Sequence, residues 1–139
     1  DIDYEAAVGG VKVAQQHLKE VNARLREERK AKDEDIQVSL QLVNEMLARG
    51  YEFLPIQLGK SRATQYVVED GKVRLPFTSL KGVGESAAVA LERATINGQE
   101  YLSIEELQQA TGVSSAVMEN LKNVGALGGL PDTSQVSFF

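Results

Sequence analysis

Residues 76–97, PFTSLKGVGESAAVALERATIN, contain the feature that decides the fold, a glycine pair at the start of a helix. A short helical turn leads into Lys81-Gly82-Val83-Gly84, and apolar residues then recur at intervals of three and four, which predicts a helix over residues 85–96. Two glycines around one apolar residue allow a tight turn. We expect Val83 to enter the core and the glycine N–H groups to face outward.

This turn places N–H groups at a helix N-terminus, where the helix dipole adds partial positive charge. A phosphate can bind there without any side chain, and Lys81 adds a mobile positive charge. The arrangement is typical of a helix-hairpin-helix, which holds the DNA backbone regardless of base sequence. Glycine pairs are also common in plain turns, and an ordinary turn is the alternative interpretation.

Two longer helices are expected upstream. Apolar residues at helical spacing predict them over residues 4–25 and 35–49. Gly9-Gly10 interrupts the first pattern and marks either a bend or the true start of that helix. Asp33 or Asp35 is expected to cap the second helix.

Between these helices and the glycine pair, the pattern changes to short extended segments. Gly50 is expected to end the second helix in a left-handed conformation. Residues 51–56, YEFLPI, suggest an edge strand or an extended segment. Residues 64–75 are rich in β-forming side chains around Asp70-Gly71, which predicts a β-hairpin with a tight turn.

Two further short helices are predicted over residues 103–110 and 114–123. Ser103 and Glu106 have the spacing of a capping box, and Ser114 or Ser115 is expected to cap the second of these helices. The fold class is therefore mainly α with a small β-hairpin. We expect a helical lobe, a helix-hairpin-helix region and a flexible C-terminal tail, with boundaries at residues 1–75, 76–130 and 131–139.

Composition excludes several classes of site. The 139 residues contain no cysteine, which excludes disulfides, thiolate zinc sites and a cysteine nucleophile. His17 is the single histidine, and we expect it on the surface. No apolar run approaches the length of a membrane span and no signal peptide is visible, so we expect a cytoplasmic protein without a membrane partner. The first residue is Asp1 rather than Met, and we expect a piece of a longer chain, with a processed chain as the alternative.

Charge is unevenly distributed along the chain. The net charge is −5, so the molecule as a whole is not an electrostatic nucleic-acid binder. Residues 60–93 nevertheless hold six bases and four acids, whereas residues 98–139 hold one base and five acids. A polyanion would therefore approach the middle of the chain. The charged run over residues 24–35 is either a solvated helix end with a linker or a phosphate-contacting arm.

Other chemistry-bearing patterns do not support an enzyme site. Gly59-Lys60-Ser61 resembles part of a P-loop, but Leu54 stands where that motif needs a glycine. We therefore reject nucleotide binding there and expect Lys60 and Arg62 to be surface bases. Two groups of acids, Glu105-Glu106 and residues 33–35, sit in first helical turns, where acids suit the helix dipole, and neither group implies a metal.

The C-terminal residues form a second distinctive feature. The tail Gln135-Val136-Ser137-Phe138-Phe139 follows a Gly- and Pro-containing stretch and ends in two aromatic residues. Either Phe138 and Phe139 fold back onto the domain, or they enter the apolar pocket of a partner as a short linear peptide.

These two features occur in the same order and at the same separation in a known family. The chain resembles the C-terminal part of the bacterial replicative DNA polymerase III α subunit, most closely the PolC type. The resemblance covers nearly the whole chain and is strongest over residues 46–139, in segments such as TSLKGVGESAAVALERA and NVGALGGLPDTSQVSFF. The glycine hairpin also looks like related DnaE-type subunits, so the PolC assignment rests mainly on the terminal peptide.

The resemblance implies specific roles. Residues 1–75 are similar to the part that closes the fingers of the polymerase, and Lys81, Gly82, Val83 and Gly84 become the grip on the primer–template duplex. Gln135, Val136, Ser137, Phe138 and Phe139 become the peptide that docks on the sliding clamp, the β subunit; Val136 and Phe138 depart from the usual leucines. The rest of the polymerase chain is the third implied partner.

The resemblance also implies where the chemistry lies. The family's catalytic carboxylates, and the divalent metal, Mg, that they would use, lie upstream of this stretch. We therefore expect no cofactor here and no polymerisation by this chain alone. The main rival is a helical protein-interaction module without nucleic-acid binding, which the acidic balance fits. A small standalone enzyme is a third alternative.

Overall fold

The computed structural model describes residues 2–133, and the chain forms two compact units. Among the described residues, the first unit comprises residues 2–54 together with residues 68–73. The second comprises residues 55–67 together with residues 74–133. The chain therefore passes between the units more than once.

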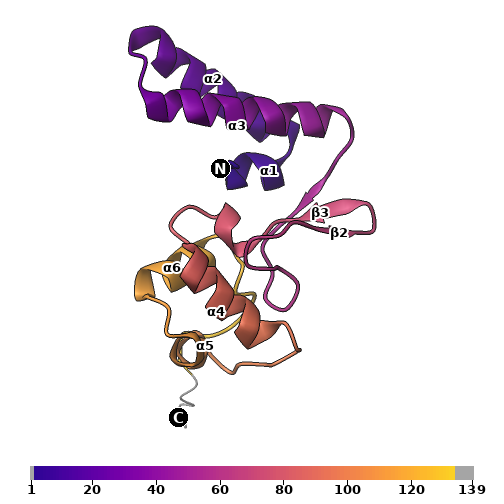
Figure 1. Cartoon of the computed structure of the whole chain (residues 1–139), viewed down its shortest axis with the longest axis vertical. Helices are drawn as coiled ribbons and strands as arrows, with labels where there is room; N and C mark the ends of the chain where they lie inside the picture. Colours follow the sequence, from indigo (N-terminus) through magenta and orange to yellow (C-terminus); the bar gives the residue numbers. More distant parts are fainter. Residues whose placement is uncertain (1, 134–139) are drawn as a thin grey trace, which may run out of the picture. The chain divides into compact units, whose positions relative to one another are not determined.

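Three helices build the first unit: α1 (Tyr4–Gly9), α2 (Val11–Glu27) and α3 (Ala31–Ala48). Gly10, with a φ of 86°, separates α1 from α2, so the predicted interruption at the glycine pair is confirmed. A positive φ is a conformation that glycine adopts without steric cost. The short connection between α2 and α3 makes them antiparallel neighbours that pack along their length (Figure 1).

Small and branched side chains fill the interface between these helices. Ala14, Val21, Leu40 and Val43 are fully buried. Asn44 donates its side-chain amide to the carbonyl oxygens of Ala14 and Leu40, at 3.1 and 2.9 Å. The interface is thus closed by apolar packing and by one asparagine that bridges both helices.

The start of α3 differs from the prediction. The helix begins at Ala31, four residues before the expected start, and its N-cap residue is Lys30. Asp33 lies inside the helix, is 8% exposed, and accepts a hydrogen bond from Arg24 Nε of α2 at 3.1 Å. The expectation that Asp33 or Asp35 caps this helix is therefore wrong, because Asp33 pairs with the neighbouring helix instead.

A small sheet of three strands follows: β1 (Phe53–Leu54), β2 (Val67–Glu69) and β3 (Lys72–Arg74), in the order β1-β3-β2. Asp70 and Gly71, both with positive φ, connect β2 and β3. This confirms the predicted hairpin turn. Strand β2 begins at Val67, three residues later than the start of the predicted hairpin at residue 64.

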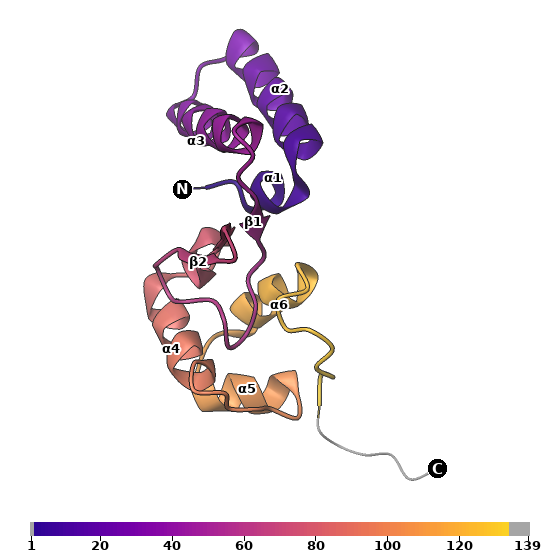
Figure 2. The same cartoon turned by 90° about the vertical axis from the view of Figure 1, so that its right-hand side faces the viewer.

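The second unit contains a 3₁₀ turn and three helices (Figure 2): η1 (Phe77–Ser79), α4 (Glu85–Thr95), α5 (Ile104–Thr111) and α6 (Ser115–Asn123). Leu91, Leu107 and Leu121, one from each helix, are fully buried together with Phe77 of η1. All three helices lie where the sequence predicted them, to within two residues at each end. The fold is mainly α with a small sheet, as expected.

The segment between β1 and β2 holds η1 in place. The N–H groups of Phe77 and Thr78 donate to the carbonyl oxygens of Arg62 and Ala63, at 2.9 and 3.1 Å. The Ser61 hydroxyl, fully buried, donates to the Leu75 carbonyl at 2.8 Å. These bonds fix the backbone that enters the glycine turn.

Across residues 2–133, we find no helix with the length and apolar character that a bilayer crossing requires. The same residues hold no group of three or more His, Cys, Asp or Glu side chains suited to a metal ion.

Candidate nucleic-acid interface

The turn between η1 and α4 has the geometry expected from its glycines. Gly82 has a φ of +92°, and the Val83 side chain is 5% exposed and packs into the core. The Val83 N–H donates to the Leu80 carbonyl oxygen at 3.1 Å. Both the side chain and the backbone N–H of Val83 are thus fixed, and Val83 anchors the turn to the core of the second unit.

The start of α4 leaves several backbone donors without a protein acceptor. Gly84 is the N-cap residue and has no side chain to accept a hydrogen bond from the first turn. Within residues 2–133, the N–H groups of Gly82, Gly84, Glu85, Ser86 and Ala87 donate to no protein atom. These groups carry the partial positive charge of the helix N-terminus.

The two glycines of the turn are glycine for different reasons. Gly82 needs the left-handed φ, and a Cβ there would lie 2.6 Å from Nδ2 of Asn120. Gly84 has a φ of −77°, and a Cβ at that position would meet no atom within 4 Å. Neither the backbone nor the packing of the described chain therefore requires glycine at position 84.

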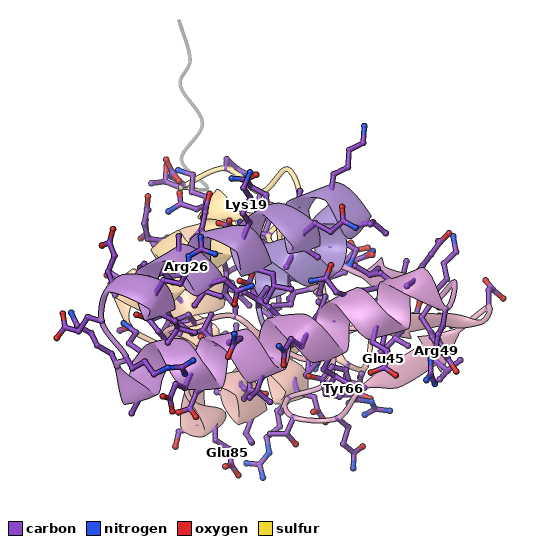
Figure 3. All side chains as sticks on the ribbon, turned by 90° about the horizontal axis from the view of Figure 1, so that it is seen from above. Lys19, Arg26, Glu45, Arg49, Tyr66 and Glu85 are labelled. Carbon is purple, nitrogen blue, oxygen red and sulfur yellow. The ribbon has the colours of Figure 1, made fainter. Side chains whose placement is uncertain are left out.

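Two exposed charges flank the turn. Lys81 is exposed and makes no ion pair within the described part of the chain. Glu85 is exposed in the first turn of α4 (Figure 3). The positive charge of Lys81 attracts an anion to the turn. The negative charge of Glu85 interacts favourably with the helix dipole but repels an anion. The attraction of the turn for a phosphate is therefore modest.

A second hairpin in the same unit repeats this geometry and was missed in the sequence. Gly112, with a φ of +71°, ends α5, Val113 is 8% exposed, and Ser114 is the N-cap of α6. The Ser114 hydroxyl accepts the N–H of Val117 at 3.2 Å. The signal was present: Gly112-Val113-Ser114 repeats the glycine, valine and small residue of the first hairpin.

The remaining helix of the unit is also capped from within. Ser103 accepts the N–H of Glu106 at 3.1 Å, and the Glu106 carboxylate accepts the N–H of Leu102 at 3.0 Å. Among the three α-helices of the second unit, α4 alone begins without a side-chain cap in the described residues. The unit therefore presents one open helix start.

Comparison with protein families identifies this architecture. A family model described as a helix-hairpin-helix motif matches residues 50–135. The chain belongs to the helix-hairpin-helix family. The match covers the β-hairpin and the described part of the second unit, including both glycine turns described above.

Comparison with individual proteins shows which helix-hairpin-helix proteins this chain is similar to. It is 37% identical over 131 residues to DNA polymerase III PolC-type of Streptococcus agalactiae, which covers 94% of this chain and 9% of the relative. It is 38% identical over 134 residues to that of Streptococcus thermophilus, covering 96% and 9%. It is 34% identical over 139 residues to that of Halalkalibacterium halodurans, covering 100% and 10%.

The helix-hairpin-helix chain thus spans about a tenth of the length of these relatives. It is homologous to a region of the PolC-type polymerase that contains the helix-hairpin-helix motif. The resemblance drawn from the sequence is confirmed at this level.

The clamp-peptide residues Gln135–Phe139 lie outside the described residues. His17, which was expected on the surface, has a side chain that is 25% exposed, and its Nδ1 lies 3.0 Å from an oxygen of Asp3, the N-cap of α1. The sequence pattern does not reveal this contact, because Asp3 precedes α1 whereas His17 lies in α2, 14 positions further along the chain.

The segment that leads to the C-terminal residues is attached to α5. The N–H groups of Ile104 and Glu105 donate to the carbonyl oxygens of Pro131 and Asp132, at 2.8 and 3.1 Å. Lys122 Nζ donates to Asp132 Oδ1 at 2.9 Å. This hydrogen bond, with the charge of Asp132, raises the pKa of Lys122 above its ordinary 10.5.

Proposed function

We propose that this chain binds the backbone of double-stranded DNA through the first glycine hairpin, without base specificity, as part of a replicative DNA polymerase. Lys81, Gly82, Val83 and Gly84 form the grip on the primer–template duplex. The glycine N–H groups and the first turn of α4 donate to a phosphate, Lys81 adds charge, and Val83 anchors the turn.

The observation that carries this proposal is the open start of α4. In the other two α-helices of this unit, a serine side chain, Ser103 or Ser114, accepts one of the first-turn N–H groups. Gly84 leaves the donors of α4 open, although the backbone and the packing allow a side chain there. An absent side chain lets the backbone of a ligand approach closely.

The proposal extends to the rest of the chain by homology. We assign residues 1–75 to the fingers side of the polymerase, residues 76–130 to duplex binding and residues 131–139 to the clamp tail. Gln135, Val136, Ser137, Phe138 and Phe139 would dock on the sliding clamp. The clamp-binding role is supported by the terminal sequence pattern and by the similarity to PolC-type polymerases. A role at replicating DNA would place the protein in the cytoplasm.

The mechanism is tethering rather than chemistry. The net charge of −5 and the exposed Glu85 keep duplex affinity low at physiological salt. A weak duplex grip joined to a clamp peptide acts at high effective concentration, so two weak contacts produce a long residence on DNA.

A salt titration of the whole chain with a labelled blunt duplex tests the duplex grip. Affinity should fall linearly on a logarithmic scale with salt, because phosphate contacts release counterions. Lys81→Ala should reduce the slope by about 0.9. Lys122→Ala is the matched control, because that lysine pairs with Asp132. Absent binding, or a flat response to salt, would favour the rival function, a helical protein-interaction module.

A further inference from the structure

The side chain of Asn120, on α6, lies against the first glycine hairpin. Its Nδ2 atom occupies the space directly above Gly82, 2.6 Å from the point where a Cβ would stand. The contact joins residues 38 positions apart, and no local sequence pattern points to it. A side-chain amide from α6 therefore lies at the glycine turn between η1 and α4.

The Asn120 amide has no partner within the part of the chain that the structure describes. It is partly buried on α6, and no hydrogen bond from its side chain to residues 2–133 is present. Asn44, by contrast, donates its amide to two carbonyl oxygens. A side-chain amide offers two N–H donors, and the amide of Asn120 remains in contact with solvent in the described chain. The amide of Asn120 is therefore available to a ligand at the hairpin.

We propose that Asn120 is an additional contact for the DNA backbone, donating its side-chain amide to the phosphate held at Gly82–Gly84. The phosphate oxygens accept several hydrogen bonds from different directions. The hairpin supplies backbone donors from one side, and α6 supplies the amide from another. This inference rests on the proposed duplex grip and adds a residue from a second element to it.

The contact with Asn120 gives a second reason for glycine at position 82. A side chain there would displace the Asn120 amide as well as strain the backbone. Glycine at 82 therefore serves the turn and also leaves room for the donor from α6. The two residues form one binding unit.

A duplex titration with three variants of the full chain tests the proposal. Asn120→Ala should weaken binding about tenfold to a hundredfold, the range of one lost hydrogen bond to a charged acceptor. The slope of affinity against salt should stay that of the parent chain, because a neutral donor displaces no counterion. Asn120→Asp should weaken binding further, most strongly at low salt, since a carboxylate then faces the phosphate. Asn123→Ala, an exposed asparagine on the same helix, is the matched control and should bind like the parent.

The outcomes separate this proposal from the duplex grip itself. If the parent chain binds and Lys81→Ala weakens it while Asn120→Ala does not, the grip stands and the role of Asn120 is refuted. If the parent shows no salt-dependent binding, the proposed function fails and this inference fails with it.

A measurement on the unmodified chain covers the case of an unfolded variant. In ¹H–¹⁵N spectra, the side-chain amide signals of Asn120 should shift on addition of duplex, and those of Asn123 should remain in place. Unmoved Asn120 signals at saturating duplex would refute the contact without any substitution.

Discussion

Gly84 and Ser114 hold the same place in the two hairpins of the second unit, each directly before a helix and after a buried valine, but only Ser114 caps its helix. The Ser114 hydroxyl accepts the N–H of Val117 at 3.2 Å, whereas the corresponding donors of α4 are left without a protein acceptor in residues 2–133. One chain thus contains a closed and an open version of the same turn.

Gly84→Ser converts the open turn into the closed one. The new hydroxyl should accept a first-turn N–H and stabilise the protein by about a few tenths of a kcal/mol. It should also weaken duplex binding by about tenfold, because one donor no longer reaches the phosphate. Denaturant unfolding and a duplex titration measure the two effects.

Gly129→Ser is the control for that substitution, because Gly129 is exposed and a Cβ there would meet no atom within 4 Å. It should leave duplex binding unchanged. A Gly84→Ser protein that is more stable and still binds duplex like the parent would show that these donors do not hold DNA.

Gly82→Ala should lower the free energy of unfolding by about 1–2 kcal/mol, the cost of a left-handed conformation for a residue with a Cβ. Gly98→Ala has a similar φ, +80°, and open space around the position, so it should cost about as much. Only Gly82→Ala displaces Asn120. The two variants should therefore match in denaturant unfolding and differ in duplex affinity. An unchanged stability for Gly82→Ala would contradict the assigned turn.

Deletion of Gln135–Phe139 should abolish binding to the sliding clamp, because it removes both aromatic residues that would enter the clamp pocket. Duplex binding should stay at the level of the parent chain. Surface plasmon resonance with immobilised clamp, alongside the duplex titration, measures both. Equal clamp affinity after deletion would refute the assignment of this peptide.

Asp132→Asn should lower the pKa of Lys122 toward 10.5, since Asp132 supplies both the hydrogen bond and the charge that raise it. In the parent chain, the raised pKa means that the contribution of this pair to stability is present below pH 10.5 and is lost as pH rises through the folded-state pKa. Side-chain NMR of Lys122 across this pH range measures the shift. A pKa that does not change would show that the pair does not persist in solution.

The features of the fold that the sequence revealed are those set by neighbouring residues. Gly10 and Gly50 end their helices with positive φ, Asp70-Gly71 forms the hairpin turn, and Ser103 caps α5. Each is a local conformational preference. The start of α3 could not be predicted in this way, because Asp33 is engaged by Arg24 on another helix.

The candidate site also combines features set by neighbouring residues with features set by packing between distant elements. The turn at Gly82–Gly84 and the burial of Val83 follow from local spacing and were predicted. Asn120 was not, because its place beside Gly82 is created by the packing of α6, far along the chain. The second hairpin at Gly112 carried a readable signal, but its serine was interpreted only as a helix cap.

The central position of β3 in the sheet has a practical consequence for dividing this protein. A chain that began at residue 55 would retain β2 and β3 but lack β1, the neighbour that pairs with β3. The backbone groups of β3 that face β1 would then form an unpaired sheet edge, which is a template for aggregation. Expression boundaries for the hairpin region should therefore fall before Phe53, where the matched family region also begins, at residue 50.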